Sequence, residues 1–238
     1  MQDKKIWATL HEYIEPGNIM GRVVANEDFL RALFAANPFD EYHFYLRGQN
    51  QIDALKARLD AEFPQLPIVY GLWNNLPEIL GKVRFSVFHL SDWVVGYVPL
   101  AMLRNRFAKH IFPITGTTHS LSYARYHAEF FKHLWRGCTP RDAIVVTSRA
   151  GKMVVAEAFK ELRENYKLSK KFAEPRLVQI PLGVPGLPEA AEISAWREAG
   201  RAELELGPDE VMLLYLGRIS HDSKKDMLAL LRVLKRLK

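Results

Sequence analysis

Short apolar runs alternate with amphipathic segments along most of the chain. The apolar runs have the length and the branched or aromatic side chains of buried strands. They cover residues 6–10, 42–46, 67–70, 85–90, 110–114, 142–147 and 176–180. Between them, helical periodicity predicts a helix that begins near residues 26–28 and further helices over residues 51–63, 99–107, 121–136 and 150–164. Strands that alternate with helices predict an α/β fold, with a doubly wound, mainly parallel, Rossmann-like sheet.

The pattern changes after the seventh predicted strand. Prolines and a glycine punctuate residues 181–185, and one more helix is predicted over residues 193–206. A further apolar run, residues 211–216, has the character of a buried parallel strand, and apolar residues from Met227 to Leu234 predict a helix after it. We therefore expect a domain, a linker and the start of a second domain. These cover residues 1–185, 186–210 and 211–238.

Two cations lie between the last predicted strand and the last predicted helix. Gly217 and Arg218 end the apolar run, and Lys224 precedes the helix. A strand, a loop with glycine and cations, and a helix together form half of a site for an anionic group. Arg218 can bind a phosphate through two N–H groups, and Lys224 can add a point charge. The alternative is an ordinary turn whose cations are merely solvated.

Polar residues and one glycine also follow several of the earlier strands. They include Asp92, Thr118, His119, the pair Ser148 and Arg149, and Gly183. Because the carboxyl ends of parallel strands share one edge, we expect these residues to lie along one rim. A lone histidine such as His119 is more often structural than functional. No second ligand stands at zinc-like spacing from it, so no metal site is predicted.

Three segments are similar to motifs of one enzyme family. TGTTHS (residues 115–120), IPLGV (180–184) and GRISHDSKKD (217–226) resemble segments of the group 1 (family 4) glycosyltransferases. In the last segment, Gly217, Arg218, Lys224 and Asp226 occupy the positions of the family's Gly-Arg, Lys and Asp. The resemblance implies the amino-terminal half of a GT-B fold over most of this chain.

The resemblance also implies roles for particular residues. Arg218 and Lys224 would grip the diphosphate of a nucleotide-sugar donor, and Lys225 is a less well spaced neighbour. The loop after the first strand would lie against the donor phosphates through backbone N–H groups. Its candidates are Gly17, Asn18 and Gly21. His119 would be the catalytic-site histidine and would hydrogen-bond a sugar hydroxyl. Asp92, Thr118, Ser148, Arg149 and Gly183 would belong to the acceptor side.

The activity that the resemblance implies is transfer of a hexosyl group from a nucleotide-diphosphate sugar to a hydroxyl acceptor. The family retains the anomeric configuration and needs neither a catalytic metal nor a cofactor, and the chain has no Asp-x-Asp motif. The family's second domain extends well beyond Lys238, so we expect a fragment that folds but does not transfer sugar alone. Two alternatives stay open: another GT-B enzyme such as a sugar-nucleotide epimerase, and a non-enzymatic module that binds phosphate or nucleic acid.

The composition of the chain indicates which kinds of partner and which cellular compartment to expect. The net charge is +6, from 33 Lys and Arg against 27 Asp and Glu, which suits an anionic ligand without naming it. The single cysteine, Cys138, fits a reducing cytoplasm. An aromatic stripe on the helix over residues 121–136 indicates core packing or, alternatively, an acceptor groove at a membrane surface. We expect a cytoplasmic protein with a sugar or lipid-linked sugar acceptor, contact with the inner membrane face in the lipid-linked case, and no nucleic-acid partner.

Overall fold

The computed structural model describes most of the chain. The described residues are 4–14, 20–135, 137–183, 186, 188–216 and 227–236. The chain forms two compact units, Met1–Gly183 and Val184–Lys238, and each is described by itself.

The first unit is built on a seven-stranded sheet in which every neighbouring pair of strands is parallel. The sheet order is β3-β2-β1-β4-β5-β6-β7. The strands are β1 (Ile6–Thr9), β2 (Glu41–Leu46), β3 (Ile68–Leu72), β4 (Val87–Leu90), β5 (Ile114–Thr117), β6 (Ala143–Val146) and β7 (Arg176–Gln179). This arrangement confirms the doubly wound, parallel α/β fold that the sequence predicts.

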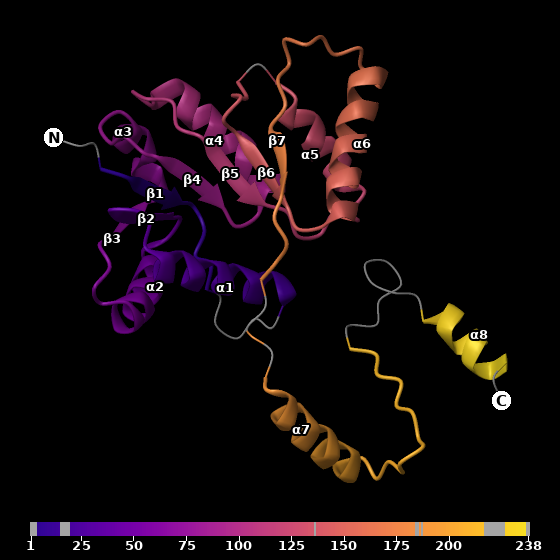
Figure 1. Ribbon diagram of the computed structural model, residues 1–238. Coiled ribbons are helices and arrows are strands. Elements are labelled where there is room, and N and C mark those ends of the chain that lie inside the picture. The colour runs from indigo at the N-terminus through magenta and orange to yellow at the C-terminus, as the bar shows by residue number, and fades with distance from the viewer. Residues whose placement is uncertain are drawn as a thin grey trace. The chain divides into compact units, whose positions relative to one another are not determined.

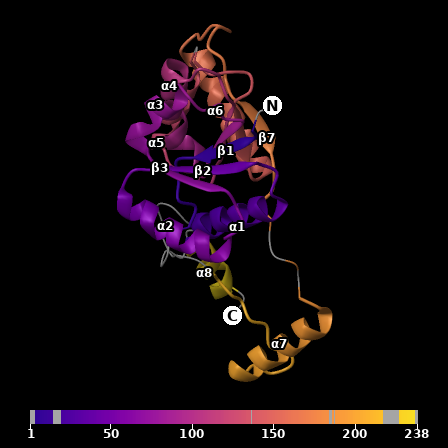
Figure 2. The same ribbon diagram turned by 90° about the vertical axis from the view of Figure 1, so that its left-hand side faces the viewer.

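Helices cover both faces of the sheet (Figures 1 and 2). They are α1 (Gly21–Ala36), α2 (Gln49–Glu62), the short 3-10 helix η1 (Trp73–Asn75), α3 (Leu76–Leu80), α4 (Trp93–Phe107), α5 (Arg125–His133) and α6 (Arg149–Asn165). Successive residues of β1 serve different faces: Trp7 packs with α1 and α2, whereas Ile6 and Ala8 pack in the cluster of α3 to α6. Burial on both faces explains the near-continuous apolar strands.

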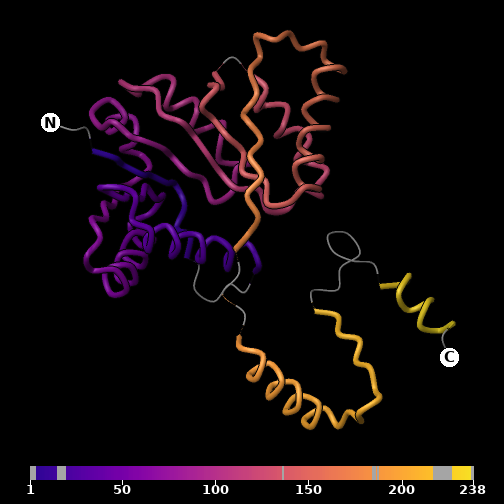
Figure 3. The backbone as a smooth tube through the Cα atoms, in the orientation of Figure 1, coloured from indigo at the N-terminus to yellow at the C-terminus, as the bar shows by residue number. Residues whose placement is uncertain are grey.

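The strand order contains one change of direction. From β1 the chain winds outward to β2 and β3, and then returns to place β4 on the other side of β1, as the trace in Figure 3 shows. The two strands pair directly, with Trp7 opposite Val87 and Ala8 opposite Phe88. The carboxyl ends of β1 and β4 therefore flank the topological switch point, where open α/β sheets bind ligands.

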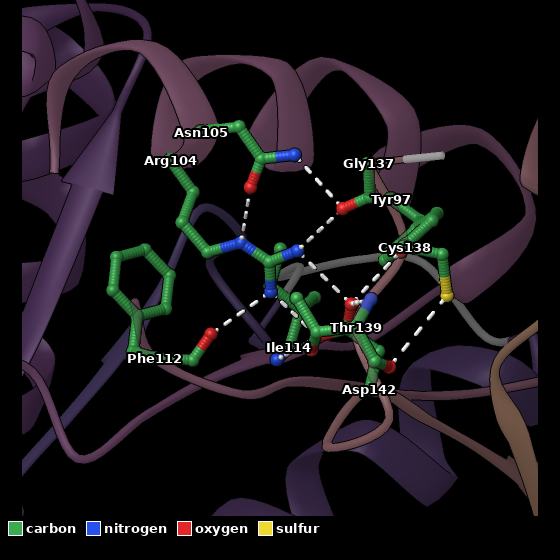
Figure 4. Close-up of polar contacts among 9 residues, drawn as sticks. All are labelled: Tyr97, Arg104, Asn105, Phe112, Ile114, Gly137, Cys138, Thr139 and Asp142. Carbon is green, nitrogen blue, oxygen red and sulfur yellow. Dashed lines mark hydrogen bonds and ion pairs between the residues drawn. The ribbon is translucent and has the colours of Figure 1, made fainter. Parts of the chain in front are cut away.

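A fully buried ion pair joins α4 to the amino-terminal edge of the sheet (Figure 4). Arg104 donates to both carboxylate oxygens of Asp142, from Nη1 at 2.6 Å and from Nη2 at 3.0 Å. The same carboxylate accepts hydrogen bonds from the backbone N–H groups of Ile114 and Thr139 and from the hydroxyl of Tyr97. The starts of β5 and β6 are thus tied to one helix.

The fifth strand is displaced from its predicted position. Residues 110–114 have an apolar pattern, but the strand runs from Ile114 to Thr117, because Pro113 has no N–H to donate to a ladder. Gly116 therefore lies inside the strand rather than in a loop. A Cβ atom at Gly116 would lie 3.0 Å from both Cβ and the carbonyl oxygen of Leu90, so the close approach of β5 to β4 requires glycine.

Two helices begin earlier than the sequence predicts. Helix α1 begins at Gly21, so Asn26 is a buried residue within the helix and not its cap. Helix α4 begins at Trp93, where the side chain of Asp92 accepts a hydrogen bond from the N–H of Val94, and Pro99 lies within it. The sequence analysis predicted this helix over residues 99–107, six residues short of its actual start.

The aromatic stripe packs mostly in the core. Tyr126, Phe130 and Leu134 are buried in the cluster of α3 to α6, while Phe131 is 38% exposed. The helix itself is shorter than predicted and covers Arg125–His133. This packing removes most of the stripe from a ligand or a membrane.

The second unit contains α7 (Ala190–Glu203) and α8 (Leu228–Arg236), neither of which has a buried residue. The strand predicted over residues 211–216 is not formed: these residues belong to no described ladder, and Val211 and Leu216 are 82% and 90% exposed. A strand needs a partner for its N–H and C=O groups, and a single apolar run supplies none.

Removing the charge of Asp142 should destabilise the first unit. Asp142→Ala leaves Arg104 buried without its counter-ion and orphans two backbone donors, so the free energy of unfolding in urea should fall by about 3–5 kcal/mol. Glu157→Gln, which breaks the exposed pair with Lys160, is the control and should leave the transition almost unchanged. Equal transitions for wild type and Asp142→Ala would show that the fold does not depend on the pair.

Candidate functional site

Polar side chains gather at the carboxyl-terminal edge of the sheet, around the switch point between β1 and β4. His11 follows β1, Ser91 follows β4 and His119 follows β5. Asn26 reaches the same place from α1. Four separate elements thus supply one cluster.

His119 is held in one orientation by two acceptors. Its Nε2 lies 2.7 Å from the carbonyl oxygen of Ser91 and 3.1 Å from Oδ1 of Asn26. A carbonyl oxygen can only accept, so Nε2 carries the proton. Burial lowers the pKa of His119, partly offset by the bond to Ser91 and the charge of Asp92, while the charge of Arg22 lowers it further. The neutral ring then presents an unprotonated Nδ1 that can accept a hydrogen bond.

His11 contacts the same serine from the other side. Its Nδ1 accepts a hydrogen bond from the backbone N–H of Ser91 at 2.9 Å and lies 2.7 Å from the Ser91 hydroxyl. Because the backbone N–H donates, Nδ1 of His11 is unprotonated, and a neutral His11 carries its proton on Nε2. Ser91 therefore links the two histidines, His11 through its N–H and hydroxyl and His119 through its carbonyl oxygen.

His89 forms the buried base of the cluster. Its Nδ1 lies 2.8 Å from the hydroxyl of Thr115, and its ring stacks on Phe29 with centroids 4.6 Å apart. Burial lowers its pKa to about 3, and protonation of the nearby His11 or His119 would lower it further. His89 is therefore neutral at physiological pH and supplies shape and polarity, not charge.

Tyr13 closes the cluster with a strained backbone. It adopts a φ of 63°, in the left-handed region, and its hydroxyl donates to the carbonyl oxygen of His89 at 3.2 Å. Its ring also stacks with Phe29 at 5.8 Å. Left-handed non-glycine residues are uncommon and concentrate at functional sites. The strained backbone of Tyr13 therefore lies beside the histidine cluster, at the carboxyl-terminal edge of the sheet near β1.

The predicted acceptor-side residues divide into two groups. Asp92 lies in the cluster, since its charge acts on His119, although its side chain caps α4. Thr118 is buried and donates to the carbonyl oxygen of Val145, so its side chain is structural. Ser148 caps α6 through the N–H of Gly151, and Arg149 begins that helix. No described contact joins Ser148 or Arg149 to His119.

The two predicted glycines in the described part show no steric need for glycine. A Cβ atom at Gly21 or at Gly183 would meet nothing within 4 Å. Gly21 is the first residue of α1, and Gly183 is the last residue of the first unit. Four further predicted residues, Gly17, Asn18, Arg218 and Lys224, lie outside the described residues.

The sequence prediction missed His11, Asn26 and His89. His11 carries the same signal as His119, a histidine just after a predicted strand, and that signal could have identified it. Asn26 has a signal for a helix cap, which concealed its role inside α1.

In the described part of the chain, no three His, Cys, Asp or Glu side chains are arranged to hold a metal ion. No described helix combines the length and apolar character needed to cross a membrane.

The buried histidines should make stability depend on pH in the acidic range. His89 and His133 both have pKa values lowered by burial to about 3, from a usual 6.5. Below about pH 6.5 the unfolded chain binds protons that the folded chain does not. The free energy of unfolding should therefore fall by about 1.4 kcal/mol per histidine for each pH unit, until the pH approaches 3.

The matched variants are His89→Gln, which cannot titrate, and His127→Gln, which changes an exposed histidine on α5. Urea unfolding at several pH values should give a shallower slope for His89→Gln and an unchanged slope for His127→Gln. The same slope in all three proteins would mean that His89 is not held neutral.

Comparison with known proteins gives no family. Neither the known protein-family models nor the curated proteins include a match to this chain. Among solved structures, a diketoreductase described for substrate-directed dual catalysis of dicarbonyl compounds has a TM-score of 0.34 and 10% sequence identity. The similarity covers 86% of this chain and 74% of that one, and at this TM-score it carries no argument about function.

Proposed function

We propose that this chain belongs to a glycosyltransferase that moves a hexosyl group from a nucleotide-diphosphate sugar to a hydroxyl acceptor. The observation that supports this proposal best is the convergence of His11, Asn26, Ser91 and His119 at the switch point of the parallel sheet. Ligands of open α/β sheets bind at such points. The proposed reaction type is inferred from the similarity of three segments to group 1 glycosyltransferases.

In this proposal His119 binds a hydroxyl group of the acceptor or of the transferred sugar. Its Nε2 proton is directed to the carbonyl oxygen of Ser91, so the unprotonated Nδ1 is the atom that can accept from a sugar hydroxyl. The lowered pKa keeps this lone pair available at neutral pH. Asn26 and Ser91 act as positioning residues because they fix the ring that would contact the substrate.

The donor side of the proposal rests on Arg218 and Lys224. As the sugar is transferred, negative charge develops on the leaving diphosphate, and a guanidinium and an ammonium group would stabilise it. Both residues lie in the segment GRISHDSKKD (217–226), which is similar to the glycosyltransferase family, and Lys225 is the alternative lysine.

Replacing His119 should impair transfer without loss of folding. His119→Ala removes one hydrogen bond to a sugar hydroxyl, worth about 0.5–1.5 kcal/mol, so kcat/KM should fall roughly two- to thirteenfold. The measurement is product formation by the full-length protein with a panel of nucleotide-sugars and sugar acceptors. His127→Ala, on the exposed face of α5, is the control and should retain the wild-type rate. Equal rates for His119→Ala and wild type would remove His119 from the site.

Replacing Arg218 should weaken donor binding. Arg218→Ala removes a charge-assisted contact worth about 1.5–3 kcal/mol, so affinity for UDP- or GDP-sugars should drop roughly ten- to a hundredfold in calorimetric titrations. Lys225→Ala should have a much smaller effect than Lys224→Ala. Equal losses from both lysine variants would mean that Lys224 is the wrong residue. A protein that binds a random oligonucleotide and no nucleotide-sugar would contradict the proposal as a whole.

A further inference from the structure

The amino-terminal edge of the sheet, opposite the histidine cluster, carries a basic pocket. It has a volume of about 500 Å³ and lies against the segments that precede β1, β4, β5 and β6. Five cationic residues line it: Lys4, Lys5, Arg84, Lys109 and Arg141. None of the described residues that line it is acidic.

The sheet order brings these cations together. In sequence they are spread from residue 4 to residue 141, but β1, β4, β5 and β6 are consecutive in the sheet. Neighbouring strands lie about 4.8 Å apart, so four strand starts span about 15 Å. A single row of positive charge therefore forms along this edge.

In the part of the chain that the structure describes, the ion pairs near this edge involve Lys4 and Arg104, and neither Lys109 nor Arg141 takes part in them. Glu41 forms an ion pair with Lys4 at 2.5 Å, and Asp40 accepts a hydrogen bond from the backbone N–H of Lys5 at 2.7 Å. Asp142, which follows Arg141, is fully buried and is compensated by Arg104 and three further donors. Its carboxylate therefore does not neutralise Lys109 or Arg141, whose residues are exposed.

From this geometry we propose that the amino-edge pocket binds a compact phosphate-bearing group. The planar guanidinium of arginine can donate two hydrogen bonds to the oxygens of one phosphate. The ammonium group of lysine adds positive charge and can bind from several directions. A hollow of this volume lies in the size range of small-molecule sites, so it has room for a phosphate-bearing group. A single-stranded nucleic acid would need aromatic side chains for stacking, and the two that line the pocket, Phe85 and Phe112, are 4% and 1% exposed.

This site is independent of the proposed glycosyl transfer. It lies at the other end of the strands from His119, and none of its lining residues belongs to the histidine cluster. The phosphate could belong to a soluble molecule or to the headgroup of an anionic lipid. Both sources offer the same chemistry, so the experiment contains one arm for each.

The test compares two doubly substituted proteins that lose the same charge. Lys109→Gln with Arg141→Gln removes two of the five cationic side chains of the pocket, and Lys56→Gln with Lys170→Gln removes two exposed lysines elsewhere. Each is titrated calorimetrically with inorganic pyrophosphate. Each is also sedimented with vesicles of phosphatidylcholine alone or mixed with phosphatidylglycerol. Thermal unfolding verifies that both proteins remain folded.

We expect the pocket variant to bind at least one probe about tenfold more weakly than wild type, and the control variant to bind it nearly as well. Loss with pyrophosphate identifies a soluble phosphate, and loss with anionic vesicles alone identifies a lipid headgroup. Pyrophosphate that binds at Arg218 and Lys224 would contribute equally to all three proteins. Absence of binding, equal loss in both variants, or pocket-dependent binding of a random oligonucleotide alone would overturn the proposal.

Discussion

The buried pair of Arg104 and Asp142 is the interaction on which the geometry of the first unit depends. Two charges without access to water are costly unless every lone pair and proton is used. Here the carboxylate accepts from the guanidinium, from the N–H groups of Ile114 and Thr139 and from the hydroxyl of Tyr97. The guanidinium also donates to the carbonyl oxygens of Phe112 and Gly137. Directional bonds of this kind fix α4 against the starts of β5 and β6, which apolar contacts alone would leave free to slide.

A parallel sheet fixed in this way has two different edges. The carboxyl-terminal edge gathers histidines that burial keeps neutral, among them His89 and His119. The amino-terminal edge gathers cations whose side chains reach solvent, such as Lys109 and Arg141. The separation follows from strand direction, since every loop that enters a strand lies at one edge and every loop that leaves a strand lies at the other. Neutral acceptors and exposed cations suit different ligands, hydroxyl groups in the first case and phosphates in the second.

The sequence predicted the sheet well because the inner strands are buried on both faces, so β1, β2, β4 and β6 are largely apolar runs of the right length. Where local chemistry competes with that pattern, the prediction failed. Pro113 displaced β5, and the apolar run at residues 211–216 forms no strand within the described residues. At the site, His119 was identifiable from its place after a strand, but its partner Asn26 is separated from it by 93 residues. The basic pocket could not be predicted from the sequence either, because its residues are far apart in the chain. Only the strand order brings residues 4 and 141 to one edge.

The charge around His119 bears on which substrate this edge would hold. The two charged groups that act most on its ring are Asp92 and Arg22, of opposite sign, and its hydrogen-bond partners are the uncharged Ser91 and Asn26. Such surroundings provide little net charge to attract a diphosphate, whereas they offer acceptors at defined positions for hydroxyl groups. A nucleotide-sugar that binds here would therefore need its phosphates compensated by cations from another segment. Arg218 and Lys224 are the cations that the proposal assigns to that role. The histidine cluster is thus better suited to hydroxyl groups of a ligand than to its phosphates.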